Sequence, residues 1–181
     1  MTNFYFDMDG VLVQYNKSDF IGDHPLYCVR NSHYFLTLKP DERVLDVMKI
    51  LSSTPSCTVN VLTSVLAQDE TLKEHIIDKT KWVSNYCPFI DIDNQLFIST
   101  GKKHHQISQI HKRPLSNKDI LIDDFNKNLN DWIRAGGISV KYANGTNNPY
   151  SFNGPLILQS DTVTDIINKL LNNKLKGPIQ F

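Results

Sequence analysis

At 181 residues the chain is long enough to bury a sizeable core, and we expect a single domain over residues 1–181. Its 19 basic and 19 acidic residues balance, so no overall charge favours a nucleic-acid polymer or a membrane surface as a partner. Three cysteines without a CxxC spacing argue against a disulfide framework and a zinc site, and the lack of a signal-peptide pattern or of a run of about 18 apolar residues predicts a cytoplasmic protein.

The stretch NFYFDMDGV, residues 3–11, joins a short apolar run to two acids and a glycine. Its aromatic residues favour a buried strand, which Asp7-Met8-Asp9-Gly10 ends abruptly. In open α/β sheets ligands bind beyond the carboxyl ends of the strands, so two carboxylates at this place indicate a site. Taken alone, a surface Asp-Gly turn is an equally good interpretation, because this dipeptide is common in turns.

Residues 16–38 predict a small insertion after the first strand, because the first helix of a minimal βαβ unit would follow within a few residues. The aromatic side chains of this segment have two interpretations. They can stack on a nucleobase, or they can form a small core of their own, which is the interpretation we favour. These aromatic residues are Phe20, Tyr27, Tyr34 and Phe35.

Three further apolar runs end in polar residues, at points where strands would end. In chain order the polar residues are Thr63 and Ser64 after VNVL, Lys102 and Lys103 in the loop after LFI, and Asp123 and Asp124 after ILI. Apolar residues at helical spacing predict helices from about Pro40 to residue 51, from about Ala67 to Tyr86 and over residues 163–171. The predicted buried stripe of the second of these helices consists of Leu72, Ile76, Val83 and Tyr86, with Trp82 beside it.

The order of the polar residues is an acid pair, a hydroxyl pair, a lysine and a second acid pair. This order resembles that of the haloacid dehalogenase superfamily of phosphohydrolases, over the chain from Asp7 to Asp124. The DMDGV block is the specific signal, and the other motifs gain weight from their order. The resemblance implies an α/β fold, a Rossmann-like three-layer sandwich with a parallel central sheet and a small cap at residues 16–38.

The resemblance also implies a role for each motif. Asp7 would attack phosphorus to give an aspartyl phosphate, while Asp9 would protonate the leaving oxygen and later deprotonate the attacking water. Thr63 and Ser64 would bind the phosphoryl oxygens.

The site needs positive charge, because a carboxylate that approaches a phosphate dianion is repelled. The repulsion is on the order of several kcal/mol per charge pair. The resemblance implies that Lys103 supplies part of this charge, with Lys102 as the alternative lysine. It implies Mg²⁺ as the cofactor, which suits a site built from oxygen atoms. The implied ligands are Asp7, Asp123 and the backbone carbonyl of Asp9, with Asp124 beside them.

Within the superfamily the chain is most similar to 5'-nucleotidases of the deoxyribonucleotidase type, through FDMDGVL, YFLTLKP, VLTS, KWVSNY and LIDD. This resemblance implies a hydrolase whose substrate is a small phosphate ester, a (deoxy)ribonucleoside 5'-monophosphate. Phe125 follows the second acid pair, where the deoxyribonucleotidases usually carry a basic residue. Three alternatives stay open: hydrolysis of another small phosphate ester, phosphoryl transfer to a second substrate, and a phosphate-binding module without catalytic activity. The sequence is also compatible with a homodimer.

Overall fold

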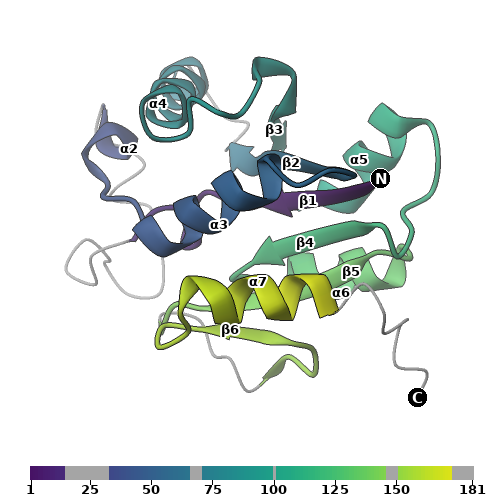
Figure 1. The fold of residues 1–181 in the computed structure, drawn as a ribbon. Helices are drawn as coiled ribbons and strands as arrows, with labels where there is room; N and C mark the ends of the chain where they lie inside the picture. The colour runs from purple at the N-terminus through teal and green to yellow at the C-terminus, as the bar shows by residue number, and fades with distance from the viewer. Residues whose placement is uncertain (15–32, 66–70, 100, 146–150, 173–181) are drawn as a thin grey trace.

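The computed structural model describes residues 1–14, 33–65, 71–99, 101–145 and 151–172. Its centre is a six-stranded sheet with the strand order β3-β2-β1-β4-β5-β6, in which every neighbouring pair is parallel (Figure 1). The strands are β1 (Thr2–Phe6), β2 (Cys57–Val65), β3 (Gln95–Ser99), β4 (Asp119–Asp123), β5 (Ile138–Ala143) and β6 (Leu156–Leu158).

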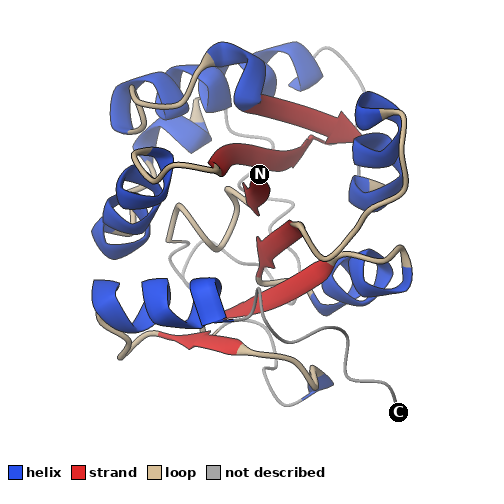
Figure 2. Ribbon diagram, turned by 45° about the vertical axis from the view of Figure 1, so that its right-hand side comes forward, coloured by secondary structure: helices blue, strands red, loops and turns tan. Residues whose placement is uncertain are grey.

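Helices cover both faces of the sheet, which gives the three layers of the predicted α/β sandwich (Figures 1 and 2). One face carries α3 (Glu42–Ser52), α4 (Thr71–Tyr86) and α7 (Val163–Asn172), and the other carries α5 (Lys103–His111) and α6 (Asn126–Arg134). The short helices α2 (Tyr34–Thr37) and η2 (Ile92–Asn94) complete the described elements. The prediction of the fold class is therefore confirmed.

The two central strands, β1 and β4, each contain a run of three apolar residues, because both faces of these strands are covered. In β1, Phe4 and Phe6 pack into the core under α3 and α4, while Tyr5 between them packs into the core under α5 and α6. In β4, Ile122 and Leu121 divide between the two cores in the same way. A strand that is buried on both sides reads as a continuous apolar run, and this is the pattern that made these strands predictable.

Strand register brings the ends of β1, β2 and β4 to one edge of the sheet. Phe6, the last residue of β1, lies opposite Val61 on one side and Ile122 on the other. The chain leaves β1 toward β2 and β3 and then returns to β4 on the other side of β1. The edge between β1 and β4 is thus a topological switch point, where ligands bind in open α/β sheets.

The sequence predicted the buried stripe of α4 correctly at Val83 and wrongly at Tyr86. Tyr86, predicted to be buried, is 40% exposed, whereas Trp82 and Val83 are fully buried. The buried face continues toward the start of the helix through His75, Asp78 and Lys79. Three of these five buried residues are polar, so an apolar pattern could not locate the first part of the face.

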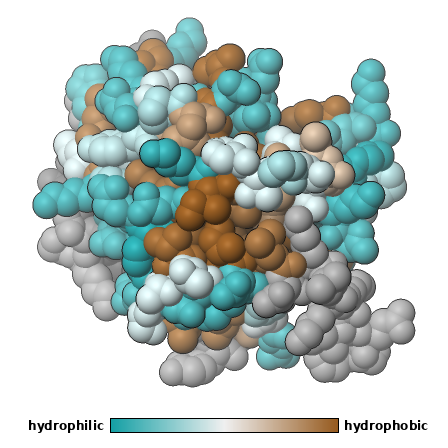
Figure 3. Space-filling model, viewed as in Figure 1, coloured by the Kyte–Doolittle hydropathy of each residue, from teal (hydrophilic) through white to brown (hydrophobic). Residues whose placement is uncertain are grey.

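Most of the insertion expected at residues 16–38 lies outside the described residues, and so does the start predicted for α4 near Ala67. None of the described helices is long and apolar enough to cross a membrane. Figure 3 shows the face that carries α3 and α7, with an apolar area near its centre. Partly exposed apolar side chains of these two helices include Ile50, Ile167 and Leu171.

Candidate active site

Three carboxylates meet at the switch point. Asp7 follows β1, Asp123 is the last residue of β4 and Asp124 follows it, and all three are buried. One carboxylate oxygen of each lies within 4.8 Å of those of the other two. Backbone N–H groups hold two of them in place: Met8 donates to Asp7 Oδ1 at 2.9 Å, and Phe125 donates to Asp123 Oδ1 at 2.8 Å.

Lys103 links two of these acids. Its Nζ lies 2.8 Å from Asp7 Oδ1 and 2.7 Å from Asp123 Oδ2, and the residue is 2% exposed, whereas the neighbouring Lys102 is exposed. Burial alone would lower the pKa of Lys103, but the two carboxylates outweigh burial and raise it above its usual value. Of the two candidate lysines, the structure therefore brings Lys103 into the cluster as a permanent ammonium.

The surroundings of Asp7 disfavour the charged form of its carboxyl group. Burial raises its pKa well above the usual value, Lys103 opposes the rise, and the nearby Asp123, Asp9 and Asp124 add to it. A buried cluster of oxygen ligands that repel one another in this way fits a hard divalent cation such as Mg²⁺. The residues present thus fit the implied metal.

Thr63 and Asp9 meet at a lysine that the sequence analysis did not identify. Lys79 Nζ donates to Asp9 Oδ2 at 2.5 Å, to Thr63 Oγ1 at 2.8 Å and to the backbone carbonyl of Ser64 at 3.0 Å. The side chain of Asp9 therefore points to Lys79 rather than joining the three grouped carboxylates. Lys79 lies one helical turn before Trp82 and Val83, on the same face of the helix, but a lysine at such a position is ordinarily placed on the surface.

Asp124 is held from the other side of the site. Asn144 Nδ2 donates to Asp124 Oδ2 at 2.7 Å and to the backbone carbonyl of Gly10 at 3.1 Å. Gly10 has φ +79°, and a Cβ at this position would lie 2.4 Å from Asp124 Oδ2. The glycine of the first motif is thus required both for its backbone conformation and for the close approach of Asp124.

Lys141 on β5 is another buried lysine, and it lies near Asp123 and Asp124. Its Nζ donates to the backbone carbonyl of Asp124 at 2.8 Å and to Asn126 Oδ1 at 2.5 Å. Burial lowers its pKa, although Asp124 and Asp123 act in the opposite direction. Lys141 therefore fixes the turn that carries Asp124.

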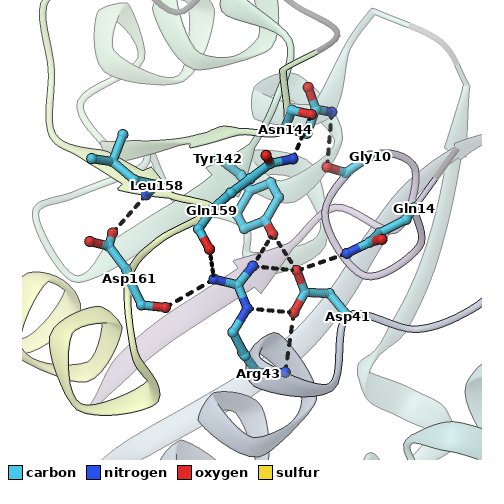
Figure 4. Close-up of polar contacts among 9 residues, drawn as sticks. All are labelled: Gly10, Gln14, Asp41, Arg43, Tyr142, Asn144, Leu158, Gln159 and Asp161. Atoms are coloured by element: carbon cyan, nitrogen blue, oxygen red, sulfur yellow. Dashed lines mark hydrogen bonds and ion pairs between the residues drawn. The ribbon is translucent and has the colours of Figure 1, made fainter. Parts of the chain in front are cut away.

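A polar network connects this side of the site to the start of α3 (Figure 4). Asn144 accepts a hydrogen bond from Gln159 Nε2 at 2.9 Å, and the guanidinium of Arg43 donates to the backbone carbonyls of Gln159 and Asp161. Arg43 also pairs with Asp41, which accepts a hydrogen bond from the Tyr142 hydroxyl. Burial alone would raise the pKa of Asp41, but these hydrogen bonds lower it, so the network contains a stable ion pair.

The aromatic residues of the expected insertion divide into two groups. Phe20 and Tyr27 lie outside the described residues. Phe35 is buried and meets the rings of Tyr34 and His75 edge to face. Phe35 therefore serves the core and offers no free face to a nucleobase.

The sequence matches no protein-family model and no curated protein. Its fold is shared with solved structures at low sequence identity. A D,D-heptose 1,7-bisphosphate phosphatase from B. bronchiseptica, complexed with magnesium and phosphate, is 13% identical, with a TM-score of 0.67 over 95% of this chain and 99% of that chain. A HAD hydrolase of family IA, variant 3, from Entamoeba histolytica is 12% identical, with a TM-score of 0.64 over 97% of this chain and 100% of that chain.

A HAD family hydrolase from Deinococcus radiodurans, with bound phosphate and sodium, is 10% identical, with a TM-score of 0.61 over 97% of both chains. The chain thus has the fold of the haloacid dehalogenase-like hydrolases, and the recognition of this fold from the sequence is confirmed. At this level of identity the likeness concerns the fold, so the chemistry has to be argued from the residues themselves.

Proposed function

We propose that the protein is a Mg²⁺-dependent phosphomonoesterase that works through an aspartyl-phosphate intermediate on Asp7. The observation that carries this proposal is the grouping of three carboxylates, Asp7, Asp123 and Asp124, of which the first two bind Lys103. Asp9 and Thr63 lie on the adjoining side. A nucleophile, a proton carrier, a hydroxyl and a fixed cation are the groups that such a reaction requires.

In the first step a carboxylate oxygen of Asp7 bonds to phosphorus as the bond from phosphorus to the leaving oxygen breaks. Asp9 gives its proton to that leaving oxygen, so the alcohol departs neutral. In the second step water attacks phosphorus and gives a proton to Asp9, and the bond between phosphorus and Asp7 breaks. Phosphate leaves and both acids return to their starting states.

The other polar groups bind and balance charge. Thr63 and Ser64 would hold phosphoryl oxygens, and Lys103 would offset the repulsion between Asp7 and the phosphate dianion, roughly 4 kcal/mol per charge pair at contact distance. Asp7, Asp123 and Asp124, with the backbone carbonyl of Asp9, would hold Mg²⁺. When bound, the ion supplies the further positive charge that a dianionic substrate needs.

For the substrate we propose a small phosphate ester, with (deoxy)ribonucleoside 5'-monophosphates as the first candidates because of the sequence resemblance described above. A sugar phosphate is the second candidate, because a heptose bisphosphate phosphatase shares the fold over nearly the full length of both chains. The cytoplasmic location and a homodimer stay predictions.

The test is phosphate release from a panel of nucleoside monophosphates and sugar phosphates, with Mg²⁺ and with a chelator. Asp7→Asn serves as the blank, because it keeps the size of the side chain but removes the nucleophile. Release that depends on Mg²⁺ and on Asp7 would support the proposal, and the preferred ester would identify the substrate class. A folded wild-type protein that releases phosphate from none of these esters would leave a phosphate-binding module as the better interpretation.

A further inference from the structure

Lys79 is a lysine in the middle of α4 whose ammonium group is fully occupied. Its N–H bonds point to Asp9 Oδ2, Thr63 Oγ1 and the Ser64 carbonyl, and its side chain is 1% exposed. An ammonium has three donors, so these hydrogen bonds satisfy all of them. A buried charge is costly unless it is paired and hydrogen-bonded, and Lys79 meets this condition only because it lies between two groups of the candidate site.

The surroundings of Lys79 hold it in this place. Its Nζ lies 4.4 Å from the centre of the Phe35 ring, a cation–π distance. Phe35 belongs to α2, which packs on α4. The ammonium is therefore closed off from water on the side of α2 and directed toward Asp9 and Thr63.

The two carboxylate oxygens of Asp9 have different surroundings. Its Oδ2 is bound by Lys79, while its Oδ1 is buried and has no hydrogen-bond partner among the described residues. A buried acceptor without a partner needs an explanation, and a catalytic role is one of the usual ones. In the proposed reaction Asp9 Oδ1 would accept a hydrogen bond from the attacking water.

We propose that Lys79 is a positioning residue for proton transfer by Asp9. It anchors Asp9 through Oδ2, so that Oδ1 is the oxygen that exchanges the proton with the leaving group and with water. It also ties the acid to the Thr63 hydroxyl, which fixes Asp9 relative to the phosphoryl group. This inference rests on the function proposed above.

The inference makes the role of Lys79 depend on the leaving group of the substrate. An alkyl phosphate expels a strongly basic alkoxide and needs a proton from Asp9, whereas p-nitrophenyl phosphate expels a stable phenolate and needs little help. A residue that acts through Asp9 should therefore matter for the first ester and hardly for the second. A residue that only supports the fold should affect both esters alike.

The experiment compares kcat/KM for a nucleoside monophosphate or a sugar phosphate with that for p-nitrophenyl phosphate, at saturating Mg²⁺. For Lys79→Met we expect a loss of about 100-fold on the alkyl ester, at the lower end of the range for general acid–base catalysis, and less than about 3-fold on the aryl ester. Asp9→Asn should show the same selectivity. The double variant should lose little more than either single variant, because the two residues act as one unit.

Lys81→Met is the matched control, since Lys81 is an exposed lysine on the same helix, and it should leave both rates unchanged. Lys79→Gln keeps a donor toward Asp9 and replaces Lys79→Met if that variant does not fold; it should show a smaller loss with the same selectivity. Equal losses on the two esters, or no loss, would overturn the inference while leaving the phosphatase proposal intact. A folded wild-type protein that cleaves neither ester would overturn both.

Discussion

Lys103 Nζ lies 2.8 Å from Asp7 Oδ1 in a pair that is closed to solvent. We expect Lys103→Met to lower kcat/KM for phosphate esters by about 100-fold or more, because a preorganised charge at the site of phosphoryl transfer is lost. Lys102→Met is the control, since Lys102 is exposed and should keep nearly full activity. The reverse result, a large loss with Lys102→Met alone, would exclude Lys103 as the charge clamp.

A metal site at the three grouped carboxylates predicts stabilisation by Mg²⁺ without any substrate. An ion that is present at about 100 times its Kd and binds only the folded state adds about 2.7 kcal/mol, which would raise the melting temperature of a chain of this size by roughly 5 to 10 °C. Asp123→Asn should remove most of this rise. Asp46→Asn, an exposed acid on α3, should keep it. An equal rise in both variants would contradict the assignment of Asp123 as a ligand.

Gly10 and Gly101 allow a matched test of close approach. Both have a left-handed backbone, with φ +79° and +82°, but a Cβ on Gly101 would meet nothing within 4 Å. Alanine at either position should cost about 1 to 2 kcal/mol for the backbone conformation. Gly10→Ala should cost about 1 to 3 kcal/mol more in urea unfolding and should weaken the Mg²⁺ response, because the new methyl group displaces Asp124. Equal effects of the two substitutions would show that Asp124 adjusts freely.

Asp119 predicts a loss of stability in acid. It is buried at the start of β4, where Arg113 donates to both of its oxygens at 2.7 and 2.8 Å. Burial alone would raise the pKa of Asp119, but hydrogen bonds from Arg113, Asn3 and Ser116 lower it to about 2. The unfolded carboxyl has a pKa of about 3.9, so the unfolded state binds more protons between these values and stability falls as the pH falls from about 4 to 2.

For this carboxyl the stabilisation present above pH 4 is on the order of 2 kcal/mol. Asp119→Asn should therefore lower the free energy of unfolding at neutral pH and flatten its slope between pH 4 and 2. Urea titrations across this range measure both quantities, with Asp46→Asn as the control. An unchanged slope in Asp119→Asn would mean that other groups cause the acid sensitivity.

The sequence was sufficient for the four strands that lead to the site and for the positions at which Asp7 and Asp123 end two of them. Residues such as Phe4 and Ile122 belong to strands buried on both faces, so each strand stands out as an apolar run, and Asp7 and Asp123 mark where two of these runs end. Parallel order then places the ends at one edge. The roles of these residues, in contrast, stay predictions until activity is measured.

Lys79 and Lys141 could not be found in the same way. A lysine in a helix or strand is ordinarily placed on the surface, and what makes these two buried is a partner far away in the chain. Asp9 lies 70 positions before Lys79, and the Asp124 carbonyl lies 17 positions before Lys141. Apolar periodicity carries no information about such pairs, because it records which residues avoid water and not which charges compensate one another.

The network of Figure 4 has a consequence for local opening of the fold. β6 has three residues and forms an edge of the sheet, and Arg43 binds the backbone carbonyls that follow it. If β6 and α7 detach together while the other strands stay paired, Arg43 loses these carbonyls and Asn144 loses its contact with Gln159. Asn144 also holds Asp124, so a ligand that orders Asp124 should slow amide hydrogen exchange in β6 and α7 without touching either element.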